Sequence, residues 1–321
     1  MRVFKALARL GRILATARPK SVPWSLNDPE EDSVEDNGNG KKLSRRPPVK
    51  WYGGKYYLAK WIVSYFPECR QYVEPFGGGA SVLLCKEPSP IEVYNDLDHR
   101  IVRFFHALRD QSDELRLLLT LTPFSEGEFY RLQVDCLEKE VTEVEAARMD
   151  YVLWRQSYSG LEDSFVPLSI RTRRNMDQNI SAWLSAIDDL LPDITQRLRE
   201  VVILERDAIG LIVDKIYDKP DTLIYCDPPY MPETRVNPGA YGVEADGEYH
   251  EKLAGVLLRS KAKVILSGYR CEQYDEWYKG WVRKDKDVVV NVSKEKSGGK
   301  GSRVESLWMN FVPEEKDMSF L

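Results

Sequence analysis

Short apolar runs alternate with segments of helical spacing over most of this 321-residue chain. The runs have the length of strands and the helical segments can cross over a sheet, so the pattern predicts βαβ units and a mostly parallel sheet. The five runs lie at residues 71–76, 91–94, 201–204, 223–226 and 262–269. Two more strands, at 287–292 and 306–312, are expected as an antiparallel pair. We therefore expect an α/β fold with a doubly wound, Rossmann-like sheet.

A long helical stretch interrupts this order. Between residues 111 and 198 the apolar spacing is helical almost throughout, while strands precede the stretch and resume at residue 201. We therefore predict that 111–198 is a helical insertion, and that residues 47–110 and 199–321 together form the sheet domain.

The first 46 residues lack a core-forming pattern. Residues 1–20 contain six Lys/Arg and no acid, a composition shared by basic amphipathic helices, organelle transit peptides and wrongly chosen upstream starts. An acidic run and a basic run follow, with few apolar residues to bury. We predict that residues 1–46 are a disordered or flexible extension and that the folded part starts near Pro47.

Composition narrows the class of protein. Hydrophobic residues make up 43% of the chain, which suffices for a buried core, but no apolar run is long enough to span a membrane. The five cysteines show no CxxC spacing and only three histidines are present, so we expect no metal site and a reducing, cytoplasmic location.

Charge is uneven along the chain. Residues 1–50 carry 11 Lys/Arg and 6 Asp/Glu, a net charge of +5, which leaves −10 for residues 51–321. Because the folded part as a whole repels phosphate, a nucleic-acid partner would need local basic patches.

The densest candidate chemistry follows the fourth apolar run, where Asp227, Pro228, Pro229 and Tyr230 stand in succession. Open α/β sheets bind ligands at the carboxyl ends of their strands. An ionised Asp227 only accepts hydrogen bonds, and the Pro228 carbonyl is a second acceptor. Both suit an amino group on a planar ring that stacks on Tyr230. A simple strand terminator with a capping aspartate is the alternative.

A glycine-rich turn follows the first apolar run. Gly77-Gly78-Gly79 lets a ligand approach the backbone, and Asp96 stands nineteen residues after Gly77. At that spacing a carboxylate at the tip of the second strand can accept hydrogen bonds from both ribose hydroxyls of an adenosine-containing cofactor. Val82 replaces the third glycine of a dinucleotide fingerprint, so a nicotinamide cofactor is disfavoured.

Three cationic segments are candidate ligand contacts. Trp51 and Lys55, around a pair of glycines, could supply a stacking face and a cation for a carboxylate, although a helix entry with a surface lysine explains them equally well. Arginines interleaved with aromatic, Asn and Gln residues suit phosphate and base contacts, and solvated loops are the equal alternative. The candidates for nucleic-acid contact are Arg155, Arg171, Arg173, Arg174, Lys296 and Lys300.

Between about Pro47 and Val312, the chain resembles the Dam-type (alpha-group) site-specific DNA adenine-N6 methyltransferases, in which motifs of these kinds occur in this order. The residues that carry the resemblance are Lys50-Trp51-Tyr52-Gly53-Gly54-Lys55, Glu74-Pro75-Phe76-Gly77-Gly78-Gly79, Asn95-Asp96, Asp227-Pro228-Pro229-Tyr230 and Glu305-Ser306-Leu307-Trp308-Met309-Asn310. The resemblance implies a Rossmann-like methyltransferase sheet and a target-recognition role for the insertion.

The resemblance also implies a role for each matching residue. Asp227 and the Pro228 carbonyl would orient the target amine, with Pro229 beside them and Tyr230 stacked on a flipped adenine. The cofactor would be S-adenosyl-L-methionine and the partner double-stranded DNA, with a cognate nuclease in a restriction-modification setting. The residues implied to contact the cofactor are Trp51, Lys55, Glu74, Pro75, Phe76, Gly77, Gly79, Asp96 and Asp227.

Two alternatives remain open at this point. An RNA adenine methyltransferase would use the same chemistry, and a DNA-binding protein without catalysis could share the scaffold. Asp227 itself disfavours two other substrates, because an asparagine there would suggest protein glutamine and a serine would suggest cytosine.

Overall fold

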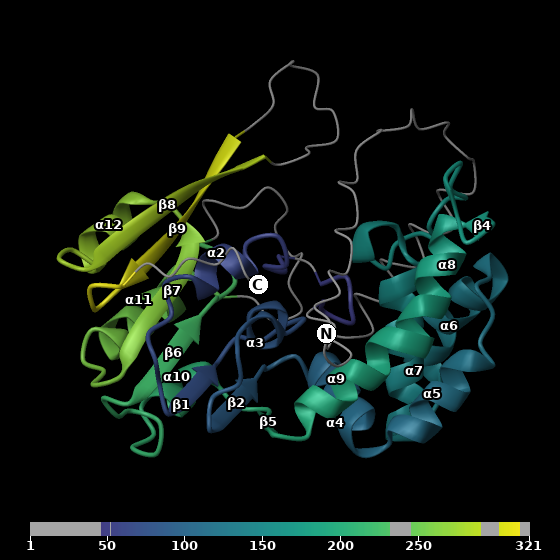
Figure 1. Ribbon diagram of the computed structural model, residues 1–321, viewed down its shortest axis with the longest axis horizontal. Helices are drawn as coiled ribbons and strands as arrows, with labels where there is room; N and C mark the ends of the chain where they lie inside the picture. The colour runs from purple at the N-terminus through teal and green to yellow at the C-terminus, as the bar shows by residue number, and fades with distance from the viewer. Residues whose placement is uncertain (1–45, 52, 232–244, 290–301, 315–321) are drawn as a thin grey trace, which may run out of the picture.

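The computed structural model describes residues 46–51, 53–231, 245–289 and 302–314 (Figure 1). Within these residues one sheet has seven strands in the order β5-β2-β1-β6-β7-β9-β8. The first five are parallel, and β9 lies antiparallel between β7 and β8. The strands are β1 (Gln71–Glu74), β2 (Ile91–Asn95), β5 (Val201–Leu204), β6 (Thr222–Cys226), β7 (Lys263–Tyr269), β8 (Val282–Val289) and β9 (Ser302–Met309). This confirms the predicted α/β class with its terminal antiparallel pair.

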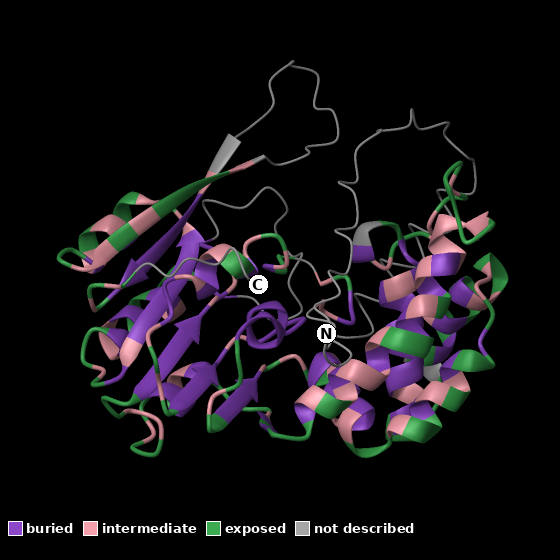
Figure 2. Ribbon diagram, viewed as in Figure 1, coloured by how far each residue is buried: buried purple, intermediate pink, exposed green. Residues whose placement is uncertain are grey.

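The strands at the centre of the sheet are buried on both faces, which explains their continuous apolar sequences. Along β6, Leu223 and Tyr225 join one buried cluster, whereas Ile224 and Cys226 join the other. This alternation follows from the two-residue period of a strand. Figure 2 shows β6 and its neighbours as buried and β8, at the edge of the sheet, as largely exposed.

Helices cover both faces of the sheet. The first cluster receives side chains from α2 (Ala59–Val63), α3 (Ser81–Cys85) and α4 (His99–Asp110). The second receives them from α10 (Ala208–Ile212), α11 (Gly247–Leu257) and α12 (Glu272–Trp277). Among the described residues, no helix combines the length and the apolar character needed to cross a bilayer.

The inserted segment is helical, as predicted, and Figure 1 shows its helices gathered on the right, opposite β6–β9. Its central helix, α7, packs against α4, α5, α6 and α8. The elements are α5 (Ser112–Thr120), α6 (Glu126–Glu138), α7 (Glu143–Gln156), a 3-10 turn (Tyr158–Gly160), a hairpin of β3 (Thr172–Arg173) and β4 (Met176–Asp177), α8 (Gln178–Ser185), a π-helical turn (Ala186–Leu190) and α9 (Leu191–Leu198).

The insertion shares its core with the sheet domain. Phe104 of α4 stacks on Tyr151 of α7 with ring centroids 5.1 Å apart, and both belong to the cluster that reaches Tyr225 of β6. The predicted boundary at residue 111 therefore crosses a continuous apolar core, and the division into domains stays a prediction.

Several predicted boundaries were wrong. The strand expected at 287–292 begins at Val282, and the one expected at 306–312 is β9, which ends at Met309. Residues 283–287 of β8 are all charged, and charged side chains are common on edge strands. They conceal the start of β8 from a search for apolar runs. The hairpin β3–β4 and helix α12 were not predicted.

Candidate active site

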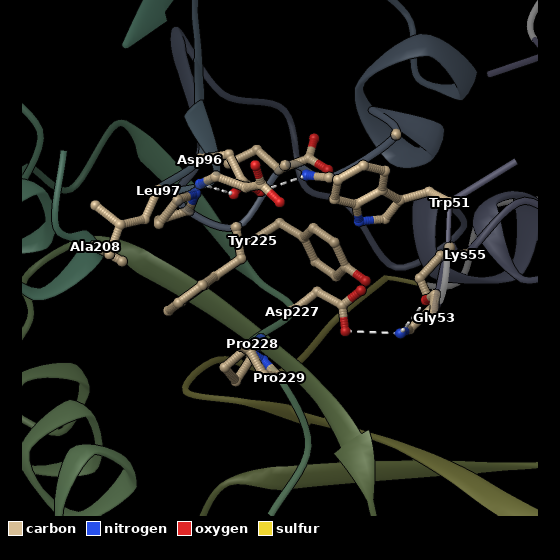
Figure 3. Close-up of a pocket in the computed structure, with 18 of the residues that line it drawn as sticks. Trp51, Gly53, Lys55, Asp96, Leu97, Ala208, Tyr225, Asp227, Pro228 and Pro229 are labelled. Atoms are coloured by element: carbon tan, nitrogen blue, oxygen red, sulfur yellow. Dashed lines mark hydrogen bonds and ion pairs between the residues drawn. The ribbon is translucent and has the colours of Figure 1, made fainter. Parts of the chain in front are cut away.

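A pocket opens where the carboxyl ends of β1, β2 and β6 meet, which is the switch point of the strand order. Every residue predicted to contact the cofactor lines it, and so do three of the four predicted catalytic residues, Asp227, Pro228 and Pro229 (Figure 3). The lining also includes Gly53, Gly54, Gly78, Ser81, Val82, Leu97, Asp98, Arg206, Ala208, Tyr225, Ala245 and Tyr249. Residues scattered over the sequence are thus brought to one site.

The glycine turn is closely packed, and this explains its composition. A Cβ at Gly77 would lie 2.1 Å from Cε2 of Tyr94, and Gly78 has a φ of +46°. The Gly78 amide donates a 2.7 Å hydrogen bond to Oδ2 of Asp96, while the Tyr94 hydroxyl donates to the Gly78 carbonyl. The turn is therefore held against the end of β2.

Trp51 joins the pocket to the insertion. Its side chain lies against Gly78 and Gly79, where a Cβ would come within 2.6 Å and 3.0 Å of it. The same indole packs edge to face with Trp154 of α7, with ring centroids 5.5 Å apart. A ligand beside the glycine turn would therefore lie next to a side chain that touches the insertion.

Asp227 follows β6 directly and is fixed through one oxygen. Lys55 Nζ lies 2.7 Å from Oδ1, and the Ser267 hydroxyl donates to the same oxygen over 2.9 Å. Figure 3 shows the Asp227 carboxylate facing the Lys55 ammonium. Within the described chain both of these contacts fall on Oδ1, so Oδ2 remains available to a ligand in the pocket.

The Lys55 ammonium is fully used by protein acceptors. Its three hydrogens match three oxygens, namely Asp227 Oδ1 at 2.7 Å, the Tyr230 hydroxyl at 2.7 Å and the Gly53 carbonyl at 3.3 Å. Burial lowers the pKa of Lys55, but the carboxylates of Asp227 and Glu305 outweigh burial and raise it overall. The carboxylate that this lysine neutralises is thus that of Asp227.

Tyr230 lies behind the pocket wall and is 9% exposed. Its hydroxyl accepts a hydrogen bond from Lys55 and is 2.9 Å from both carboxylate oxygens of Glu305, to which it donates. Its ring packs against Tyr269 with centroids 4.3 Å apart. Stacking on a flipped base stays a prediction for this ring.

Two further carboxyl groups in the pocket have perturbed pKa values. Burial raises the pKa of Glu74 to about 8, against a 2.8 Å hydrogen bond from the Tyr72 hydroxyl. Burial also raises the pKa of Asp96 to about 6, against hydrogen bonds from the amides of Asp98 and Gly78. A charged ligand in the pocket would therefore shift the pKa of both carboxyl groups.

The predicted DNA-contacting arginines fall into two environments, both outside the pocket. Arg171, Arg173 and Arg174 are exposed on and beside the β3–β4 hairpin. Arg155 is half-buried, and its guanidinium donates a 3.2 Å hydrogen bond to the Ala182 carbonyl of α8. Lys296 and Lys300 lie outside the described residues. No cluster of three or more potential metal ligands occurs among the residues that are described.

Sequence reasoning gave no role to three residues of this site. Tyr225 and Ser267 come from buried strands, and their hydroxyls lie 3.0 Å apart beside Asp227. Glu305 belongs to one of the motifs that carry the resemblance, and its place in that motif was the available signal.

The sheet order, the glycine turn beside Asp96 and the strand-end Asp-Pro-Pro-Tyr sequence are those expected of a methyltransferase of the α/β class. The model of the D12 class N6 adenine-specific DNA methyltransferases matches residues 51–292, and the chain belongs to this family.

The names of similar proteins agree with this family. The chain is 25% identical to the type II methyltransferase M1.LlaDCHI of Lactococcus lactis subsp. cremoris, over 81% of this chain and 94% of that protein. It is 23% identical to the DNA adenine methylase of Serratia marcescens, over 72% and 86% of the two chains. A DNA adenine methylase of Vibrio cholerae is 36% identical over a shorter segment, 21% of this chain and 24% of that protein.

Proposed function

We propose that this protein transfers the methyl group of S-adenosyl-L-methionine to the N6 amine of an adenine flipped out of duplex DNA. The observation that most supports the proposal is the position of Asp227, which borders a pocket suited to a nucleoside and has Oδ2 available. Family membership supports the same reaction.

The side chains that line the pocket fit the proposed cofactor. Asp96 offers carboxylate oxygens to ribose hydroxyls, and Phe76, Leu97 and Pro229 offer apolar surface to an adenine ring. Glu74 provides a carboxylate for a cationic part of the ligand. When bound, S-adenosyl-L-methionine supplies an electrophilic methyl group on a sulfonium.

Asp227 and Pro228 would activate the amine. The lone pair of the adenine amine is conjugated with the ring, so the amine is a poor nucleophile. Hydrogen bonds from its two hydrogens to Asp227 Oδ2 and the Pro228 carbonyl favour a pyramidal nitrogen and direct its lone pair into the pocket. The Asp227 carboxylate also balances the positive charge that develops on the nitrogen.

The target base must leave the helix before it reaches this pocket. Flipping costs a few kcal/mol of unstacking, and stacking on an aromatic side chain recovers part of that cost. The exposed arginines of the hairpin are suited to DNA contact, and Figure 1 shows the hairpin on the upper side, toward which β6 also runs. A cognate nuclease remains a prediction for this chain.

The test is transfer of labelled methyl from S-adenosyl-L-methionine to unmethylated duplex DNA, with the product nucleosides separated. We expect label in N6-methyladenine, loss of that label in Asp227→Ala, and retained cofactor binding by calorimetry. Asp113→Ala, on the exposed first turn of α5, is the matched control and should stay active. Near-normal turnover of Asp227→Ala, or label only in RNA or protein, would contradict the proposal.

A further inference from the structure

Glu305 is a buried carboxylate next to the candidate catalytic residues. It lies on β9, the antiparallel strand that is inserted between β7 and β8, and is 2% exposed. Both of its carboxylate oxygens are 2.9 Å from the Tyr230 hydroxyl, and Oε1 is 3.8 Å from Lys55 Nζ. Burying a carboxylate costs free energy unless hydrogen bonds and nearby positive charge compensate for the lost water. The groups that contact Glu305 therefore indicate its role.

The distances separate two possible roles. Glu305 is the more distant of the two counter-ions of Lys55, because Asp227 Oδ1 lies 2.7 Å from the ammonium and Glu305 Oε1 lies 3.8 Å from it. As an acceptor for Tyr230, by contrast, it presents both oxygens at equal distance. Its main contact is therefore with the tyrosine hydroxyl.

Tyr230 is also held by Tyr269 of β7, which lies beside Glu305 in the sheet. Glu305 of β9 is paired with Tyr269 of β7, so their side chains project from the same face of the sheet. The Tyr269 ring packs on the Tyr230 ring while Glu305 accepts from the Tyr230 hydroxyl. Two neighbouring strands thus fix both the face and the tip of this tyrosine.

We propose that Glu305 is a positioning residue for methyl transfer, which anchors Tyr230 through its hydroxyl and thereby holds Lys55 and Asp227 in place. The proposal rests on the proposed function, because it assigns Glu305 to the same site. Tyr230 donates its single hydrogen to Glu305, so its oxygen is left to accept from Lys55, and Lys55 in turn donates to Asp227. In Glu305→Gln one acceptor oxygen becomes an amide donor, so the direction of the Tyr230 hydrogen bond is no longer fixed and this order of donors and acceptors is lost.

The experiment compares full-length wild type with Glu305→Gln, Tyr230→Phe and the double variant, using labelled S-adenosyl-L-methionine and unmethylated plasmid DNA. Small displacements of catalytic groups cost up to about 100-fold in rate. We expect Glu305→Gln to lower kcat by about 10- to 100-fold, with the cofactor Kd unchanged within about twofold. In the Tyr230→Phe background the same substitution should have little further effect, because the two residues act as one unit.

A matched control separates positioning from stability. Glu92 of β2 is also buried and ion-paired, with Lys86 and Arg197, and does not line the pocket. We expect Glu92→Gln to lower the melting temperature without lowering the kcat of the folded protein. If Glu305→Gln fails to fold, Glu305→Asp, which shortens the side chain but keeps the charge, serves in its place, with the same loss of kcat expected.

The outcomes distinguish the two proposals. An active wild type with a fully active, folded Glu305→Gln variant would overturn the positioning role alone. An equal fall in kcat in the wild-type and Tyr230→Phe backgrounds would also overturn it, because Glu305 would then act independently of Tyr230. A wild type that transfers no methyl to DNA would overturn the proposed function and the role of Glu305 with it.

Discussion

Glu74 is the carboxyl group in the pocket whose protonation should respond most to a bound cation. Its pKa of about 8 leaves it largely neutral at pH 7, whereas a sulfonium or ammonium nearby favours the carboxylate. Binding of S-adenosyl-L-methionine should therefore release a proton. Between pH 6.5 and 8, affinity should rise with pH by up to about tenfold per unit.

Calorimetry in buffers of different ionisation enthalpy measures both the affinity and the proton release. S-adenosylhomocysteine, which lacks the sulfonium charge, is the matched ligand and should show a weaker pH dependence. Glu74→Gln should remove the dependence in this range, and an unchanged pH profile in that variant would contradict the assignment.

The same pKa has a consequence for the stability of the ligand-free protein. A carboxyl group whose pKa is higher in the folded state favours folding at low pH, and this contribution is lost as pH rises through the folded pKa. For Glu74 the loss falls between its ordinary value of 4.5 and about 8. Burial of this carboxyl is thus a cost that a bound cation would relieve.

Among single residues, the sequence predicted more of those that line the pocket than of those behind it. Asp96 could be identified because its spacing from Gly77 reflects the fixed geometry of a βαβ unit. Glu305 could not be identified in this way, because it lies 75 residues after Tyr230 in the chain. Its contact with Tyr230 depends on β9 entering the sheet beside β7. No local pattern records that pairing.

Among the elements, the glycine turn after β1 depends most strictly on its sequence. A methyl group at Gly77 would overlap the Tyr94 ring, so Gly77→Ala must displace either the turn or the end of β2. We expect a loss of about 1–3 kcal/mol in unfolding free energy and at least tenfold weaker cofactor binding, as for other overpacked sites. Chemical denaturation and calorimetry measure the two effects.

Gly247→Ala is the control for this substitution. Gly247 begins α11. Apart from its chain neighbours and its own helix backbone, no described residue comes within 4 Å of the place that an alanine methyl would occupy, so the substitution should be neutral or slightly stabilising. Equal behaviour of the two variants would show that the turn tolerates a side chain.

The β3–β4 hairpin shows how an element can remain hidden from pattern analysis. Each strand has only two residues, and the turn between them places Arg174 and Asn175 at φ of 54° and 60°. These values are those of a type I′ turn, which normally favours Asn-Gly, so this arginine-containing turn carries little sequence signal. The arginines were predicted as DNA contacts from their clustering with Asn, Gln and aromatic residues, without any expectation of a hairpin.

The environments of the arginines predict different effects on binding. Arg173→Ala, on the exposed hairpin, should weaken DNA binding and reduce the dependence of log Kd on log salt by about one unit if it contacts a phosphate. Arg155→Ala should instead lower stability, because its guanidinium joins α7 to α8. Fluorescence anisotropy across a salt series, together with thermal melts, separates the two. An unchanged salt slope for Arg173→Ala would exclude a phosphate contact.

For the whole molecule, the order of elements was predictable, whereas the relation between insertion and sheet was not. Apolar runs and helical periods identified five parallel strands and a helical stretch between the second and third of them. Periodicity marks which face of a helix is buried, but it does not show what covers that face. In the structure, α4 and α7 bury theirs against each other in a cluster that reaches the sheet.

This continuous core predicts that the insertion and the sheet unfold together. Phe104, fully buried between Tyr151, Phe105 and Trp154, belongs to α4 but packs against the insertion. Phe104→Ala should therefore cost about 3–5 kcal/mol and lower a single cooperative transition. Hydrogen exchange of peptides from α7 and β6 should show the same decrease in opening free energy.

Tyr130→Ala is the control, because that side chain is 37% exposed and its loss should cost far less. Two separate transitions, with only the α7 peptides affected by Phe104→Ala, would show that the insertion is an independent domain. A single transition would mean that DNA contacts on the hairpin and ligand contacts in the pocket stabilise one cooperative unit. A ligand that binds at either site would then raise the melting temperature of the whole unit.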